Sequence, residues 1–93
     1  MTTREQALKD RVAREDQERQ MFGCTAAAID EALATMSSRE VAQYAMDTLW
    51  NAQSLIQPPH EGETTWSVAD RDGNTIRQFI NIAKYAIDKA VPR

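Results

Sequence analysis

Mostly apolar side chains recur at intervals of three and four residues through the first third of the chain. The stripe contains seven apolar and two charged members: Leu8, Val12, Glu15, Arg19, Phe22, Ala26, Ile29, Leu33 and Met36. This spacing places all of them on one seam of an α-helix, and the alternation of three and four is typical of coiled coils. The pattern therefore predicts a long first helix whose seam is covered by another helix.

The charge pattern marks the start of this helix as a separate segment. Residues 4–19 contain five basic and five acidic side chains, and opposite charges fall four positions apart, as in Arg11/Glu15 and Glu15/Arg19. Each such pair stabilises a helix by about 0.2–0.5 kcal/mol. Thr2 with Glu5, or Thr3 with Gln6, has the spacing of a capping box. Residues 1–20 are predicted to form a charged helical arm, which is either simply solvated or docked on a second chain.

Gly23 lies between the charged arm and the following segment, in which apolar side chains cover a broader face of the predicted helix. Glycine in a helix interior costs about 1 kcal/mol relative to alanine, so this residue could mark a bend. The sequence leaves open whether it breaks the helix. If it does not, residues 4–36 form a rod about 50 Å long, at about 1.5 Å per residue. Such a rod would overhang so small a domain, and we expect dimerisation through the overhang.

A second helix is predicted to begin after Ser37, because Ser37 and Glu40 have capping-box spacing, and to end at Pro58-Pro59. Residues 21–57 would then form an antiparallel helical hairpin, with the turn between Thr35 and Ser38. Small side chains would face one another across it: Ala26, Ala28 and Ala32 against Ala42, Ala45 and Ala52.

The last third of the chain predicts a linker and a third helix. Residues 58–72 are the linker, pinned to the hairpin by Trp66, and residues 73–91 are a helix capped by Asp72 and halted by Pro92. An alternative is a β-hairpin over residues 66–77 that turns at Asp72-Gly73. We therefore predict the all-α class: residues 1–93 form a single helical domain, an antiparallel helical hairpin with a long first helix plus a third packing helix.

Composition and charge narrow the function. The net charge is −3 and the pI about 5.0, which argues against nucleic acid, since phosphate binding requires a basic face. No stretch approaches the roughly 18 apolar residues of a membrane span, and we expect no membrane partner. One cysteine cannot form an internal disulfide, and the N-terminus carries charge where a signal peptide would be apolar. We expect a cytoplasmic protein.

The candidates for chemistry are few. Cys24 is expected to be buried and inert within the first helix, and His60 to be solvated in the linker. Residues 70–74 resemble a calcium loop, but Gly73 comes too soon and position 81, where the loop glutamate would stand, is Asn81. No phosphate-binding or catalytic motif is present in the sequence. We predict no enzyme activity, no cofactor and no metal site.

Arg39-Glu40, followed by Leu49-Trp50-Asn51-Ala52, resembles the helical hairpin of phage proteins that sequester cyclic-nucleotide immune messengers. The resemblance covers these six residues, and in those proteins the two elements lie about one helical turn further apart. It implies that Arg39 would contact a phosphate. Fourteen alanines, and eight arginines against three lysines, suggest a GC-rich genome. A short helical chain of this composition resembles the accessory proteins of actinobacterial phages.

Two function classes follow. The first is a non-enzymatic protein–protein interaction module, of a phage accessory or host-inhibitory type, which forms a homodimer or binds another protein. Its partner-binding residues would be Leu8, Val12, Glu15, Arg19 and Phe22. The alternative is an oligomeric protein that binds and sequesters a small ligand or nucleotide, in pockets around Arg39, Trp50 and Arg71.

Overall fold

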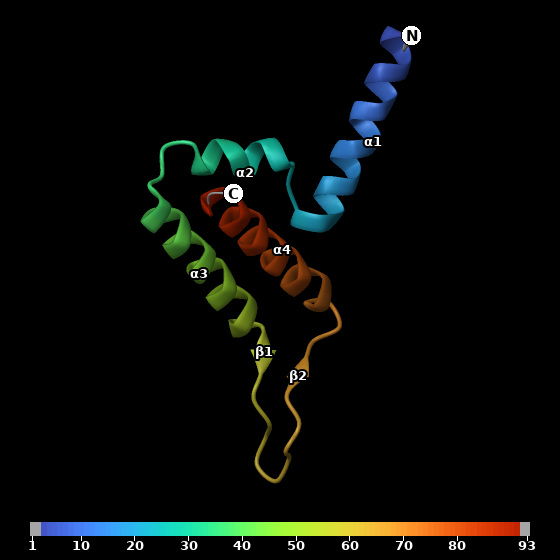
Figure 1. Cartoon of the computed structure of the whole chain (residues 1–93). Coiled ribbons are helices and arrows are strands. Elements are labelled where there is room, and N and C mark those ends of the chain that lie inside the picture. The colour runs from blue at the N-terminus through green and yellow to red at the C-terminus, as the bar shows by residue number, and fades with distance from the viewer. Residues whose placement is uncertain (1–2, 92–93) are drawn as a thin grey trace.

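The computed structural model describes residues 3–91, which form four helices and one small two-stranded sheet (Figure 1). The helices are α1 (Arg4–Phe22), α2 (Ala26–Leu33), α3 (Ser38–Ser54) and α4 (Gly73–Ala90). The strands are β1 (Ile56–Gln57) and β2 (Ser67–Val68). The all-α class is confirmed, with four helices in place of the three predicted.

The central unit is the antiparallel pair of α3 and α4, which lie side by side along their lengths (Figure 1). Each helix presents a buried stripe to the core: Val41, Ala45, Thr48 and Ala52 on α3, and Ile76, Ala83 and Ala86 on α4. Three or four residues separate most neighbours in each stripe, so one helix face carries them all, and their small size lets the two axes approach closely. The buried Thr48 hydroxyl is satisfied because it donates to the Tyr44 carbonyl at 2.8 Å.

The predicted hairpin partner of α3 was wrong. Residues 26–36 were expected to pack along it, but α2 has only eight residues and crosses near the end of the α3/α4 pair (Figure 1). Its buried side chains are Ile29 and Leu33, whereas Ala28 and Ala32 are exposed. α4 presents an apolar stripe over 18 residues and so can bury far more of α3 than α2 can.

Gly23 breaks the first helix, so the continuous rod over residues 4–36 does not form. Its φ of +78° is left-handed, and its N–H donates to the Arg19 carbonyl at 2.8 Å, which ends α1. After Cys24, the Thr25 side chain accepts a hydrogen bond from the Ala28 N–H and begins α2. The chain therefore changes direction within three residues.

The helix starts largely follow the predicted caps. Thr3 accepts from the Gln6 N–H at 3.1 Å, and Ser37 and Glu40 form the complete capping box. Asp72 stands at the N-cap of α4, but its side chain makes no capping hydrogen bond. The alternative cap Thr2 and the stop at Pro92 lie outside the described residues.

A short β-ladder replaces both the predicted end of the second helix and part of the linker loop, because α3 ends at Ser54, before Pro58, and β1 follows it directly. Ile56 pairs with Val68 and Gln57 with Ser67, antiparallel, so the strands extend the α3/α4 pair (Figure 1). The alternative hairpin about Asp72-Gly73 is wrong, because β2 pairs with β1 and Gly73 begins α4. Trp66 is 61% exposed, so the prediction that it pins the linker is also wrong.

The turn at Gly23 predicts a clear stability effect. Gly23→Ala places a side chain in a left-handed conformation, at a cost of about 1–2 kcal/mol. It also sets a Cβ 3.2 Å from the Gln78 Oε1 atom. We expect the free energy of unfolding, measured by urea titration with circular dichroism, to fall by at least about 1 kcal/mol.

Gly73→Ala is the matched control, because Gly73 has no left-handed φ and an added Cβ would meet no atom within 4 Å. Its free energy of unfolding should be unchanged or raised by up to about 1 kcal/mol. Equal stability of Gly23→Ala and the unchanged protein would show that the turn does not need glycine.

Candidate functional site

The first four turns of α1 project from the rest of the molecule (Figure 1). We call residues 4–19 the arm, and α2, α3 and α4 together the body. Every residue from Thr3 to Arg14 is exposed. Leu8 is 60% exposed and Val12 is 49% exposed. The arm is thus a helix with two large apolar side chains that nothing in the body covers.

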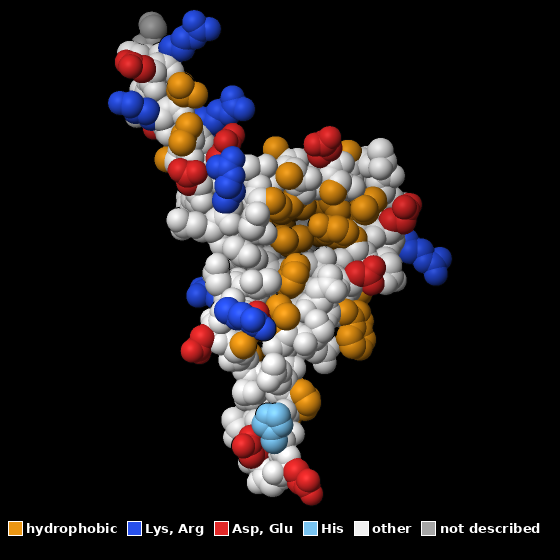
Figure 2. Space-filling model, turned by 180° about the vertical axis from the view of Figure 1, so that it is seen from behind, with side chains coloured by type: hydrophobic (Ala, Val, Ile, Leu, Met, Phe, Trp, Pro, Cys, Tyr) orange, Lys and Arg blue, Asp and Glu red, His pale blue; other side chains and the backbone are white. Residues whose placement is uncertain are grey.

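Polar contacts run along the arm, which has no packed face. Gln6 donates to Asp10 at 2.9 Å, and Arg11 pairs with Glu15 at 3.2 Å. Arg19 pairs with Glu15 at 3.6 Å and with Asp16 at 3.2 Å. Figure 2 shows the resulting alternation of basic and acidic side chains around a few apolar ones. Each exposed pair contributes only a few tenths of a kcal/mol, so the arm gains little stability from them.

The structure separates the predicted seam residues into two groups. Leu8 and Val12 are exposed on the arm, and the Glu15 and Arg19 side chains, 30% and 53% exposed, lie on the same helix face. Phe22 is buried in the core, where its ring meets the Tyr85 ring edge-on at 5.5 Å. Its inclusion among partner-binding residues was wrong, because its partner is the chain's own α4.

The base of the arm is held by side chains of α4. The Asn81 amide donates to the Met21 carbonyl at 2.9 Å, and the Gln78 amide donates to the Gln20 carbonyl at 3.4 Å. Glu18 accepts from the Ala26 N–H at 3.3 Å and so joins the arm to the start of α2. These contacts fix the direction in which the arm leaves the body.

Tyr85 links the end of α1, α2 and α4 at one point, because its ring contacts Phe22 and its hydroxyl contacts Asp30. Its hydroxyl donates to Asp30 at 2.7 Å, while Lys89 lies 3.7 Å from the same carboxylate and 5.4 Å from the Tyr85 ring centre. Burial, then the hydrogen bond and charge of Asp30, and then the charge of Glu18, raise the pKa of Tyr85 to about 12.

Sequence reasoning missed this group of anchoring residues. Gln78, Asn81 and Tyr85 follow one another at intervals of three and four, which puts them on one side of α4. The sequence did contain a signal for these anchors, namely a stripe of polar side chains that ends in a tyrosine and lies beside the apolar face of α4. That α1 would meet this stripe depends on the turn at Gly23.

Further apolar side chains are exposed on the body: Met46 and Trp50 on α3, and Ile80 and Ile87 on α4. These side chains lie on α3 and α4, which pack against each other through their buried faces. Leu8 and Val12 differ because every residue around them, from Thr3 to Arg14, is exposed.

The alternative ligand residues do not meet within one chain. Arg39 lies in the first turn of α3 and Trp50 lies three turns later. Arg71 precedes α4, at the opposite end of the antiparallel pair from Arg39, and its side chain is 88% exposed. Trp50 is 62% exposed. A pocket made by these three residues would require several subunits.

The other candidates for chemistry are also separated. Cys24 is half-buried in the turn after α1, outside the helix in which it was expected, and His60 is exposed in the loop between β1 and β2. Residues 69–72 form a turn, with the Asp72 N–H donating to the Ala69 carbonyl. Across residues 3–91, no three His, Cys, Asp or Glu side chains are grouped to hold a metal ion. Within that range no helix is long and apolar enough to cross a membrane.

The Tyr85 contact predicts a pH effect on stability. An unfolded tyrosine ionises near its ordinary pKa of 10.0, while the folded one ionises near 12. The unfolded state therefore loses its proton first, so this stabilisation is complete below pH 10 and is lost as the pH rises to about 12. Tyr85→Phe should abolish that part of the pH dependence in urea unfolding.

The measured quantity is the difference in free energy of unfolding between the unchanged protein and Tyr85→Phe, because all other titratable groups are common to both proteins. The difference should shrink between pH 10 and 12. Asp30→Asn should narrow the pH range over which this difference shrinks, because removing the carboxylate charge brings the pKa of Tyr85 closer to its ordinary value. A difference that stays constant up to pH 12 would contradict the raised pKa.

The chain matches no protein-family model, and no curated protein or solved structure is significantly similar to it. A function must therefore be inferred from the fold and the contacts described above. The arm is the feature that suggests one, because its large apolar side chains are not covered by α2, α3 or α4.

Proposed function

We propose that this chain is a non-enzymatic protein–protein interaction module that binds its partner through the arm of α1. The observation that supports this is the exposure of Leu8 and Val12 on a helix that the body leaves uncovered. Burying one such side chain contributes about 1.5–3 kcal/mol. A partner helix over both would bury the largest apolar feature of the arm.

The lack of a packed face along the arm supports the same proposal. Helices in proteins derive most of their stability from packing of an apolar face. The arm holds 16 residues from Arg4 to Arg19, with packed contacts at its base alone. A helix this long that served only as a spacer would have no need of Leu8 and Val12 on one face.

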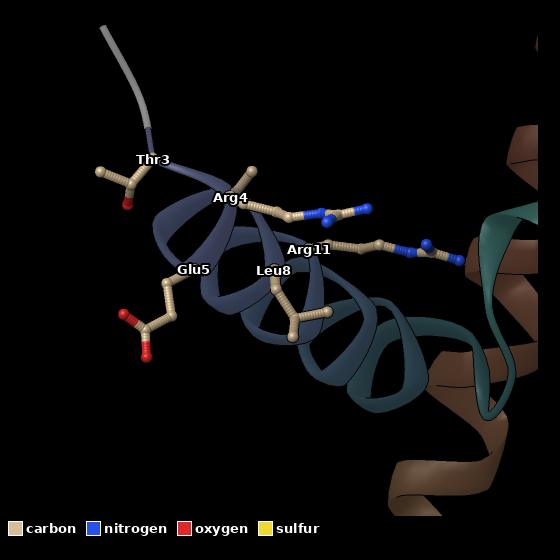
Figure 3. Close-up of a pocket in the computed structure, with 6 residues that line it drawn as sticks. Thr3, Arg4, Glu5, Leu8 and Arg11 are labelled. Atoms are coloured by element: carbon tan, nitrogen blue, oxygen red, sulfur yellow. The ribbon is translucent and has the colours of Figure 1, made fainter.

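The surface around Leu8 indicates the chemistry of the partner. Thr3, Arg4, Glu5, Ala7, Leu8 and Arg11 line a shallow depression on the arm. Figure 3 shows the Arg4 and Arg11 side chains extending side by side, with Glu5 pointing elsewhere. Guanidinium groups bind carboxylates in preferred geometries, so the depression suits a partner surface that is apolar with acidic neighbours. The apolar contact would provide affinity and the charges selectivity.

Photo-crosslinking in cells that naturally express the chain tests the proposal. A photoreactive amino acid at Leu8 should form covalent adducts, because that side chain would lie within the interface. The same amino acid at Gln17, on the opposite face of the helix, should form several-fold fewer. Adducts are detected on denaturing gels and identified by mass spectrometry.

Adducts with a second copy or with another protein both support an interaction function. Equal, weak labelling from Leu8 and Gln17 would overturn it, because the arm would then be a solvated helix. Circular dichroism of each substituted protein verifies that the arm remains helical.

A further inference from the structure

The charges beside the Leu8–Val12 seam are divided along the arm. One flank carries Arg4, Arg11 and Glu18, which are seven residues apart, and the other carries Lys9 and Asp16, also seven apart. Residues seven apart in a helix lie on the same side. Each flank is therefore basic toward the N-terminus and acidic toward the body.

We propose that the partner of the arm is the arm of a second copy of this chain, running antiparallel. This inference rests on the function proposed above and identifies the partner. In an antiparallel pair each flank faces the same flank of the other helix in reverse order, so the basic half of each arm meets the acidic half of the other. Lys9 would face Asp16 of the partner subunit, and Arg11 would face Glu18 of the partner subunit. The two-fold axis makes every such contact occur twice.

A parallel pair does not give the same match. There each flank faces the opposite flank of the partner, which brings Arg4 beside Lys9 and Arg11 beside Asp16. The first contact is repulsive and the second attractive, so they cancel. The division of charge thus favours the antiparallel pair.

The same arrangement accounts for the two charged residues of the seam. In the antiparallel pair, Leu8 and Val12 lie over Arg19 and Glu15 of the partner subunit. Within one chain Glu15 pairs with Arg11 at 3.2 Å and with Arg19 at 3.6 Å, and Arg19 also pairs with Asp16 at 3.2 Å. Both charges are thus balanced within the arm, and the aliphatic stems can cover apolar side chains. Leu8 and Val12 of each arm would then be covered by the aliphatic stems of Glu15 and Arg19 of the other arm.

The base of the arm offers room for the start of a second arm. A groove between α1 and α2 is lined by Arg11, Arg14, Glu15 and Glu18 on one side and by Thr25, Ala26, Ala27 and Asp30 on the other. The small side chains of Ala26 and Ala27 leave space there for the first turn of the arm of the second copy.

Charge reversal on one flank tests the proposal, with the dimer dissociation constant measured by sedimentation velocity. Lys9→Glu should weaken the antiparallel dimer about tenfold, because two attractive contacts become repulsive. It should strengthen a parallel dimer, in which Lys9 faces Arg4. Asp16→Lys alone should also weaken the dimer about tenfold. Combining Lys9→Glu with Asp16→Lys should restore the dissociation constant to within about threefold of the original.

Asp10→Lys is the matched control, since it makes the same chemical change as Asp16→Lys on the face away from the seam. It should leave the dissociation constant unchanged, and circular dichroism should show equal helix content in all variants. Mixed dimers of the unchanged and doubly reversed proteins should be about tenfold weaker than either homodimer, because two pairs of like charges would meet on that flank.

Three outcomes overturn the antiparallel pair: a monomer at all concentrations, a dimer strengthened by Lys9→Glu, or a double variant as weak as the single ones. None of these overturns the interaction function, which photo-crosslinking at Leu8 tests separately. Crosslinks from Leu8 to a different protein, together with a monomer in sedimentation, would support that function and exclude this partner.

Discussion

Phe22 enters the core at the last residue of α1, and the left-handed turn at Gly23 sends the chain away from the helix axis immediately afterwards. This constraint determines the shape of the whole molecule. The core ring of Phe22 holds the base of α1 against Tyr85, so the sixteen residues before Gln20 must leave the body. A residue that permitted α1 to continue into α2 would remove the turn that follows the contact between Phe22 and Tyr85.

The body depends on a different kind of packing. Alanines and one threonine form most of the contact between α3 and α4, and their small volume permits close helix axes at the expense of apolar area per residue. A body of this size has a modest core. Burial of Leu8 and Val12 in an assembly would add apolar contact that the monomer does not have.

The arm combines a weak apolar seam with a strong pattern of charge. Two large apolar side chains are too few to bind other proteins non-specifically. Charges at heptad spacing, in contrast, can select both the partner helix and its orientation, parallel or antiparallel. The ion pairs within the arm, such as Arg11 with Glu15, favour the helix by only a few tenths of a kcal/mol each. Packing against a partner would therefore add most to the stability of the arm.

The sequence by itself determined the local features of this protein. The capping box at Ser37 and Glu40, the cap at Thr3, the all-α class and the helix of residues 4–19 all depend on residues within a few positions of one another. Only the tertiary structure decided that Gly23 adopts a left-handed turn, that the arm projects with Leu8 and Val12 exposed, that α3 pairs with α4, and that Phe22 lies in the core. These outcomes depend on competition between partners distant in the chain. α4 buries more of α3 than α2 can, and Tyr85, Gln78 and Asn81 stabilise one placement of α1, which no local spacing records.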